Sequence, residues 1–212
     1  MSEASAKPRR TALQRVQIVM WVLVALATLG LAALLLYRPG EPAPPSSPGM
    51  TFTMGGPFTL TGSDGQPFSS SELAGKPYAM FFGFTHCPDV CPTTLARLAK
   101  LRQQLGQGED SFRIVFVSVD PGRDTPQAVG AYADLFDTPV IALTGTPAQI
   151  EQVTKSHAIY SAKVQQEGVP DGYTVDHTAT VLLFDKAGKF QSTIALEEQD
   201  GAALDKLRRL TA

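Results

Sequence analysis

Hydrophobic and polar positions divide the chain into an apolar N-terminal run and a domain-length stretch of alternating patterns. Residues 16–37 carry no charge, and at about 1.5 Å of rise per residue a helix of that length would span the roughly 30 Å hydrocarbon core of a bilayer. After residue 50, short β-rich runs alternate with runs of helical period. The pattern predicts an α/β sheet domain with some antiparallel hairpins, attached to one membrane helix.

The expected elements of the domain follow one another closely. An early hairpin is predicted from 57–60 and 66–68, and a capping box at 69–72 opens a short helix. Buried strands are expected at 78–84, 112–119 and 181–185 and a further strand at 140–143, with a return strand at 190–195 after the turn 186–189. The helices are expected from Pro92 to near Gly106, from Thr125 and Pro126 onward, at 147–157 and at 201–210.

Positive charge precedes the apolar run and predicts its orientation. Residues 1–15 hold four basic residues and one acid, so the positive-inside rule places them in the cytoplasm and the domain on the other side. A cleaved signal peptide is the alternative. Its apolar core is usually about 7 to 15 residues long, and the run at 16–37 exceeds that length. An uncleaved transmembrane anchor is therefore favoured.

Residues 38–50 contain five prolines and predict an extended linker that reaches up to about 40 Å at roughly 3.1 Å per residue. The short basic N-terminus lacks a long amphipathic import presequence, which favours a bacterial inner membrane with the domain in the periplasm. The net charge of −2 and the lack of a basic stripe after residue 50 argue against a nucleic-acid partner.

The cysteines are the strongest chemical signal. Cys87 and Cys91 are the only two in the chain, and both are expected on the loop between the strand 78–84 and the helix that Pro92 opens. A thiol before a helix N-terminus faces the positive end of the helix dipole, which favours the thiolate that binds metals and attacks disulfides. No cysteine remains for a structural disulfide elsewhere, so the chemistry is expected in this loop.

A cysteine loop that leads from the carboxyl end of a sheet strand into a helix is typical of the thioredoxin-like fold. Three segments carry a closer likeness: 82–92 (FGFTHCPDVCP), 117–126 (VSVDPGRDTP) and 173–178 (YTVDHT), the last leading into the strand 181–185. They resemble the signature of the Sco/SenC family of copper chaperones, in the family's order and spacing. The likeness covers nearly all of 52–210 and implies a thioredoxin-like domain at 51–212.

The resemblance implies that Cys87, Cys91 and His177 are metal ligands. Two thiolates and an imidazole suit Cu(I), and the imidazole also tolerates Cu(II), whereas structural zinc usually takes four ligands. The family's client is the binuclear copper site of cytochrome c oxidase subunit II. The resemblance therefore implies a membrane-anchored metallochaperone that delivers one copper ion to this partner during oxidase assembly.

Two enzymatic alternatives use the same thiols. As a thiol-disulfide reductase, the protein would use Cys87 and Cys91 as its catalytic pair and keep the client's cysteines reduced. A peroxidase of the peroxiredoxin type is disfavoured, because those enzymes place a threonine three residues before the cysteine, where this chain has Pro88. His177 replaces the cis-proline that thioredoxin-like proteins usually carry before this strand, which weakens the case for a general disulfide exchanger.

Other polar residues near these segments have simpler explanations. His86 is an alternative ligand, although its side chain should point away from that of its neighbour Cys87. His157, near a helix end, is interpreted as structural, with a cationic ring offsetting the helix dipole. Asp176 could orient His177 or cap a loop, and Asp89 could make a turn. The segment 120–126 is assigned to strand ending, ion pairing and helix capping, with partner docking as an alternative.

Overall fold

The computed structural model describes residues 12–36, 54–168 and 172–212, and in the N-terminal helix it describes side chains only at 16–32. The expected linker 38–50 and most of the expected cytoplasmic segment 1–15 lie outside these residues. Contacts divide the chain into two units, Met1–Thr51 and Phe52–Ala212.

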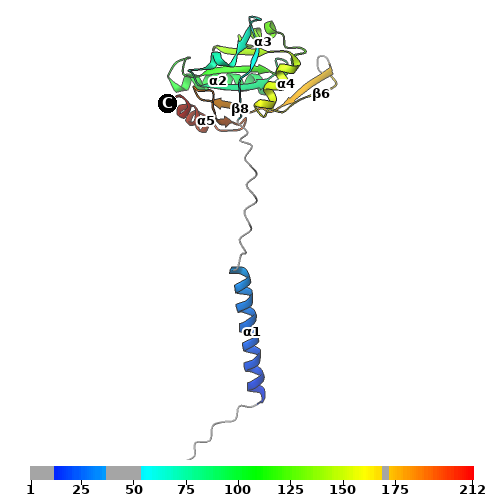
Figure 1. Cartoon of the computed structure of the whole chain (residues 1–212), viewed down its shortest axis with the longest axis vertical. Helices are drawn as coiled ribbons and strands as arrows, with labels where there is room; N and C mark the ends of the chain where they lie inside the picture. The colour runs from blue at the N-terminus through cyan, green and yellow to red at the C-terminus, as the bar shows by residue number, and fades with distance from the viewer. Residues whose placement is uncertain (1–11, 37–53, 169–171) are drawn as a thin grey trace, which may run out of the picture. The chain divides into compact units, whose positions relative to one another are not determined.

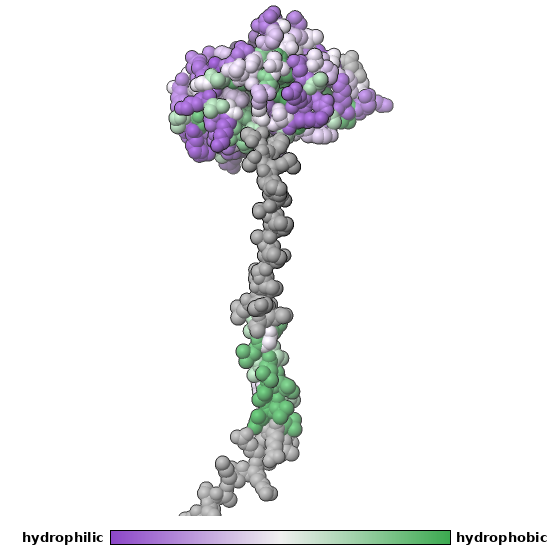
Figure 2. All heavy atoms as spheres, viewed as in Figure 1, coloured by the Kyte–Doolittle hydropathy of each residue, from purple (hydrophilic) through white to green (hydrophobic). Residues whose placement is uncertain are grey.

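The first unit contains the helix α1, Ala12–Leu36. Its side chains at 16–32 are exposed, and they form a strongly apolar surface (Figure 2). Within the part of the chain that the structure describes, no helix combines the length and the apolar character that a membrane crossing requires.

The second unit is an α/β domain built on a seven-stranded sheet in the order β2-β1-β5-β4-β3-β8-β9 (Figure 1). Its strands are β1 Thr59–Gly62, β2 Pro67–Ser69, β3 Tyr78–Gly83, β4 Arg113–Ser118, β5 Val140–Thr144, β8 Val181–Phe184 and β9 Phe190–Ile194. Its helices are the 3-10 helix η1 Ser70–Leu73 and the α-helices α2 Val90–Leu105, α3 Pro126–Ala133, α4 Pro147–Ser156 and α5 Asp200–Thr211.

The centre of the sheet is the most hydrophobic part of the domain. All six residues of β3 are buried, and β3 runs parallel to β4 with Gly83 opposite Ser118. On its other edge, β3 pairs antiparallel with β8. Strands that are covered on both faces need continuous apolar runs, which is the pattern that the sequence has here. The register brings the carboxyl ends of β3 and β4 together, so the loops that follow them are neighbours.

A second sheet holds only two strands, β6 Ser161–Gln165 and β7 Tyr173–His177, which pair antiparallel. In Figure 1, β6 extends outward from the side of the domain. Neither strand is predicted by the sequence pattern. Their burial is irregular, and Ser161 lies opposite His177, which places one of the expected metal ligands at the base of this hairpin.

The remaining elements agree with the sequence predictions, with local corrections. The capping box of Ser69 and Glu72 and the cap of α3 by Thr125 are present as predicted, and the early hairpin is present with β1 two residues later than expected. Thr146 caps α4, which was not predicted. However, α2 begins at Val90, two residues before the expected start at Pro92. Proline is tolerated throughout the first helical turn because the amide that it lacks has no partner there.

Candidate metal centre

The junction between β3 and α2 places the two cysteines differently. Cys87 lies in the loop and is partly exposed, whereas Cys91 lies in the first turn of α2 and is fully buried. The expectation that both sulfurs lie on the loop was therefore wrong for Cys91. The helix starts early enough for the backbone N–H of Cys91 to point at the Cys87 sulfur, 3.4 Å away. This contact puts Cys87 at the positive end of the helix.

The fold brings His177 to the same place from 86 residues further along the chain. Its Nε2 lies 3.5 Å from the Sγ of Cys91, and the candidate ligand atoms of Cys87, Cys91 and His177 all lie within 4.8 Å of one another. First-row metals hold sulfur and nitrogen at about 2.0 to 2.3 Å. Shifts of a few tenths of an ångström would let one ion contact all three atoms, so the arrangement fits a small thiophilic metal.

Neighbouring groups fix the orientation of the His177 ring. Its Nδ1 lies 3.2 Å from the carbonyl oxygen of Thr178; in the metal-loaded protein this contact would keep the ring proton on Nδ1 and leave the Nε2 lone pair for the metal. The rings of Phe81 and Phe84 meet the imidazole edge to face, with centroids 6.0 and 5.9 Å away. The imidazole is therefore held between a polar contact and an aromatic wall.

The two thiols of the site have very different pKa values. Hydrogen bonds from the Cys91 side chain, from His177 and from the backbone N–H groups of Cys91 and Asp89 outweigh the effect of burial and lower the pKa of Cys87 to about 4. The pKa of Cys91 is raised, first because its hydrogen bond to Cys87 favours the neutral thiol and then because it is buried. At neutral pH the metal-free pair thus holds a Cys87 thiolate and a Cys91 thiol, and a metal that binds both sulfurs would displace the remaining proton.

A glycine makes room for the buried sulfur. A Cβ atom at Gly83, the last residue of β3, would lie 2.8 Å from the Sγ of Cys91. That distance is well inside normal contact, where nonbonded carbon atoms are separated by about 3.5 to 4.0 Å. Glycine at this position is therefore required by the position of the Cys91 sulfur.

A buried carboxylate fixes the start of the cysteine loop. Asp124 accepts hydrogen bonds from the backbone N–H of Thr85 at 2.9 Å and from the Thr85 hydroxyl at 2.6 Å. It also accepts one from the hydroxyl of Ser118 at 2.6 Å, and its side chain is fully buried. This role of Asp124 was not predicted from the sequence. The available signal was the position of Asp124 in the loop after β4, which adjoins the loop after β3.

The other expected candidates lie outside the Cys87–Cys91–His177 group. His86 is partly exposed, with Nδ1 at 3.0 Å from the Thr85 hydroxyl and 3.7 Å from Asp124. Asp176 is exposed, and as the neighbour of His177 in β7 its side chain lies on the opposite face of the strand. Asp89 is the N-cap residue of α2 and accepts a hydrogen bond from the Thr93 hydroxyl at 3.2 Å.

His157 is structural, as expected, but for a different reason. It is 1% exposed, its ring packs against Phe58, Phe82 and Phe184, and burial lowers its pKa. The expectation of a cation that offsets the dipole of α4 was wrong, because a charged ring in this aromatic surrounding would lose its hydration. His157 is a neutral core residue that hydrogen-bonds the carbonyl of Val153.

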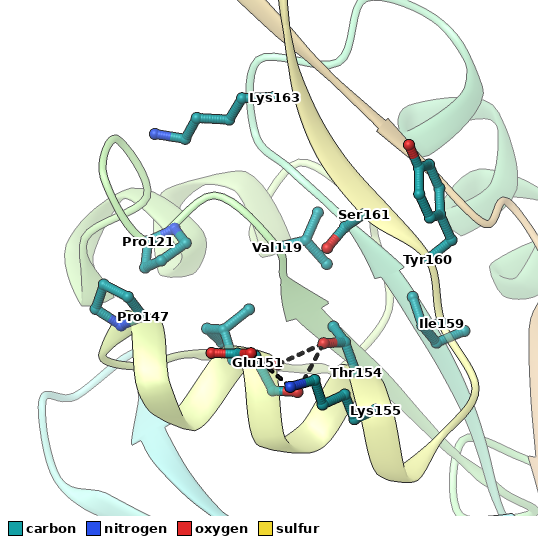
Figure 3. A pocket seen from close by; sticks show the side chains of 11 residues that line it. Val119, Pro121, Pro147, Glu151, Thr154, Lys155, Ile159, Tyr160, Ser161 and Lys163 are labelled. Carbon is teal, nitrogen blue, oxygen red and sulfur yellow. Dashed lines mark hydrogen bonds and ion pairs between the residues drawn. The ribbon is translucent and has the colours of Figure 1, made fainter.

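A cavity of about 500 Å³ lies beside α4 and β6 (Figure 3). Val119, Ile150 and Ile159 contribute apolar surface, and Lys155 and Lys163 lie among its polar lining residues. None of the three candidate ligands lines it. The candidate metal centre is therefore a cluster at the end of the sheet and is separate from this cavity.

The fold and the cluster define a class: a thioredoxin-like domain in which a C-x-x-x-C pair and a distant histidine form a small site for a thiophilic metal. Comparison with known proteins is more specific. The family model SCO1/SenC matches residues 47–212, and the chain belongs to this family.

Relatives support the same assignment. The mitochondrial protein SCO2 of Saccharomyces cerevisiae is 36% identical over 157 residues, which is 73% of this chain and 52% of the yeast protein. The chain thus spans about half the length of that relative. The copper-bound structure of Bradyrhizobium japonicum ScoI is 40% identical, with a TM-score of 0.67, over 74% of this chain and 99% of that one. The copper-bound structure of Arabidopsis thaliana ScoI is 35% identical, with a TM-score of 0.69, over 74% and 98%.

Proposed function

We propose that this protein is a copper metallochaperone that binds one copper ion through Cys87, Cys91 and His177 and delivers it to the binuclear copper site of cytochrome c oxidase subunit II. The convergence of the three ligand atoms within 4.8 Å is the observation that carries the proposal. The copper-bound structures of the two relatives support copper as the metal, and the client is the one expected for the family.

The ligand set suits a metal that must be passed on. Soft thiolates select Cu(I), and the imidazole extends the set to Cu(II). Cys91 is buried, while Cys87 and His177 are partly exposed. An incoming ligand from the client can therefore approach the ion from the exposed side. The copper would be exchanged stepwise, with the partly exposed ligands leaving before the buried sulfur.

The proposed location rests on the sequence. The uncharged run 16–37 follows a basic segment, which supports a single-pass anchor in a bacterial inner membrane with the domain in the periplasm. The proline-rich residues 38–50 would then be a linker between the anchor and the domain. Fractionation of cells, with protease added to spheroplasts, tests this arrangement: the domain should be digested from outside, and protection of the domain would contradict it.

The metal-binding proposal is tested with the purified, reduced full-length chain in detergent. Wild-type protein should bind about one equivalent of copper, and Cys87→Ala, Cys91→Ala and His177→Ala should each weaken binding by at least about 10-fold. His86→Ala is the matched control, because its ring lies outside the ligand cluster, and it should bind copper like the wild type. Equal copper affinity in the wild type and His177→Ala would exclude the histidine from the site.

The structure also favours a second candidate function, thiol-disulfide reduction. The partly exposed Cys87 with its low pKa is suited to attack, and the buried Cys91 to resolve. The Cys87 thiolate would attack a client disulfide, forming a mixed disulfide and releasing one client thiolate. Cys91, after losing its proton, would then attack the Cys87 sulfur and release the second client thiolate, so that two electrons reach the client and Cys87 and Cys91 form a disulfide.

The two functions respond differently to the loss of His177. A reductase should keep turning over a disulfide substrate in His177→Ala and should lose turnover in Cys87→Ala. A metallochaperone should lose copper affinity in both variants. Measuring copper content and disulfide turnover on the same samples therefore separates the two proposals.

A further inference from the structure

Among the residues that the structure describes, the hairpin that carries His177 has no strand pairing with the main sheet. β6 and β7 form a separate two-stranded sheet in the part of the chain that the structure describes. The position of His177 relative to the cysteines must therefore depend on side-chain contacts of β7, which include the buried Val175 and the packing of the His177 ring on Phe81 and Phe84. At the carboxyl end, the backbone N–H of Thr178 donates to the carbonyl of Tyr160 at 3.0 Å, and the Thr178 hydroxyl accepts from the N–H of Tyr160 at 3.1 Å, which continues the pairing of β7 with β6.

A cluster of three residues holds the other end of β7, and we call it the hairpin clamp: Asp120 and Arg123 from the loop after β4, and Tyr173 at the start of β7. The Tyr173 hydroxyl donates to the carboxylate of Asp120, with Oδ1 at 3.0 Å and Oδ2 at 3.1 Å. The Arg123 guanidinium donates to the backbone carbonyl of Tyr173 at 3.2 Å. It also stacks over the Tyr173 ring, with its central carbon 3.8 Å from the ring centroid.

Charge and burial make the clamp a rigid contact. The Nε of Arg123 lies 2.5 Å from Oδ2 of Asp120, and the two side chains are only 9% and 0% exposed. The planar guanidinium can pair with a carboxylate and stack on an aromatic ring at once, which lysine cannot do. Loss of one partner of such a buried pair is costly, because it leaves an uncompensated buried charge. Lys163 of β6 also approaches this ion pair, with its Nζ 3.6 Å from Oδ1 of Asp120.

Two sets of contacts connect the clamp to the candidate metal centre. The first set runs along β7, where every second residue lies on the same face of the strand: Tyr173, Val175 and His177. An anchor at Tyr173 therefore fixes the face of β7 that carries the imidazole, about 13 Å further along the strand. Arg123 also lies over the ring of Phe84 at 5.8 Å, and Phe84 packs edge to face against the His177 ring at 5.9 Å. The same guanidinium thus supports the strand of His177 and the aromatic wall behind its ring.

From this geometry we infer that Asp120, Arg123 and Tyr173 are positioning residues for His177, and that the clamp sets how readily the histidine leaves the copper ion during transfer. The inference rests on the proposed function, because it assigns His177 as a copper ligand. With the clamp intact, the imidazole is held near the sulfurs and release is slow. When the clamp opens, the hairpin can move away while both cysteines keep the ion.

Tyr173→Phe is the most selective test, because it removes the bonds of the hydroxyl to Asp120 and Lys163 and keeps the ring under Arg123. Tyr160→Phe is the matched control: the same change next to the same hairpin, at a side chain that is 64% exposed. Copper transfer from the reduced, loaded full-length protein to a chromogenic Cu(I) chelator should be about 10-fold faster in Tyr173→Phe. It should be unchanged in Tyr160→Phe, and Arg123→Lys should be at least as fast as Tyr173→Phe.

A double variant shows whether the clamp acts through the histidine. If it does, adding Tyr173→Phe to His177→Ala should cause no further change in the transfer rate, because coupled residues are non-additive. Equal fold-changes in the wild-type and His177→Ala backgrounds would overturn the inference, since they would show that the tyrosine acts on general stability.

Hydrogen exchange of the metal-free protein tests, without copper, whether the clamp holds β7 in place. Backbone amides at 174–177 should exchange faster in Tyr173→Phe than in the wild type or Tyr160→Phe, while those of β3 and β4 should not change. Unchanged exchange in β7 would refute the clamp even if copper binding is confirmed. Conversely, a wild-type protein that binds no copper would refute the proposed function, and faster exchange in β7 would still show that the clamp positions the hairpin.

Discussion

Replacement of Gly83 by alanine tests whether the buried Cys91 sulfur must sit where the structure places it. The new Cβ would lie 2.8 Å from Sγ of Cys91, 3.0 Å from the Phe116 ring and 3.1 Å from the Phe81 ring. Normal contact distances are about 3.5 to 4.0 Å, so the sulfur would have to move by roughly 0.7 Å or more. The aromatic rings on the other sides leave few directions for that movement.

The expected effects of Gly83→Ala are a loss of stability and a larger loss of copper affinity. Extra methyl groups in packed cores typically cost about 1 to 3 kcal/mol. A displaced sulfur also misaligns the ligand set, and disturbances of metal-ligand orientation typically reduce affinity by about 10- to 100-fold. Urea unfolding measures the first effect, and competition with a Cu(I) chelator measures the second.

Gly201→Ala is the control for this experiment. Gly201 lies in the first turn of α5, and a Cβ there would meet nothing within 4 Å. The replacement should leave copper affinity unchanged and should raise stability by up to about 1 kcal/mol, because alanine favours helix more than glycine does. If folded Gly83→Ala bound copper as tightly as the wild type, the argument that Cys91 is confined by this glycine would be refuted.

Three further predictions follow from the electrostatics of the domain. In the reduced, metal-free protein, alkylation of Cys87 should fall to half its maximal rate at a pH of about 4; a midpoint near that of a free thiol would contradict the thiolate assignment. Asp124→Asn should lower the free energy of unfolding by about 1 to 3 kcal/mol, because the amide cannot accept all the bonds that Thr85 and Ser118 donate; equal urea midpoints would argue against this role. The pKa of His157 lies below its ordinary value of 6.5 in the folded state, so the unfolded chain binds the proton first and stability should fall as the pH drops below 6.5; a His157→Gln variant should lose that part of the pH dependence.

Most of the domain could be predicted from the sequence because its strong elements are locally encoded. The buried runs of β3 and β4 are continuous and apolar, and the helices α3 and α4 begin with a threonine cap and a proline. These signals depend only on neighbouring residues, so pattern and capping rules detect them. The cysteine pair is local too, and its position after a buried strand identified the site.

The hairpin β6–β7 and the clamp could not be predicted in the same way. β6 alternates polar and apolar residues, but Ala162 and Val164 are its only apolar positions and most of the strand is exposed, so the pattern is too short and too weakly hydrophobic to separate a strand from a loop. Tyr173 meets Asp120 from 53 residues away, and His177 meets Cys91 from 86 residues away. Contacts at such separations depend on the completed sheet. The resemblance to the Sco/SenC family supplied His177, but Arg123 and Tyr173 acquired their role only when the structure placed them together.

The start of α2 shows how a local rule can mislead. Because proline favours the first position of a helix, the sequence predicts that this helix begins at Pro92. The structure starts the helix two residues earlier, at Val90, and this moves Cys91 from the loop into the helix. The change matters chemically, because it buries one sulfur and leaves the other in contact with a helix N-terminal amide.

X-ray absorption at the copper edge of the Cu(I)-loaded protein tests the central claim most directly. The account predicts that the wild-type spectrum requires two sulfur ligands and one nitrogen ligand. It also predicts that His177→Ala loses the nitrogen contribution and keeps both sulfurs. A wild-type spectrum with sulfur ligands alone, or a nitrogen ligand that persists in His177→Ala, would contradict the assignment of Cys87, Cys91 and His177 as the copper site.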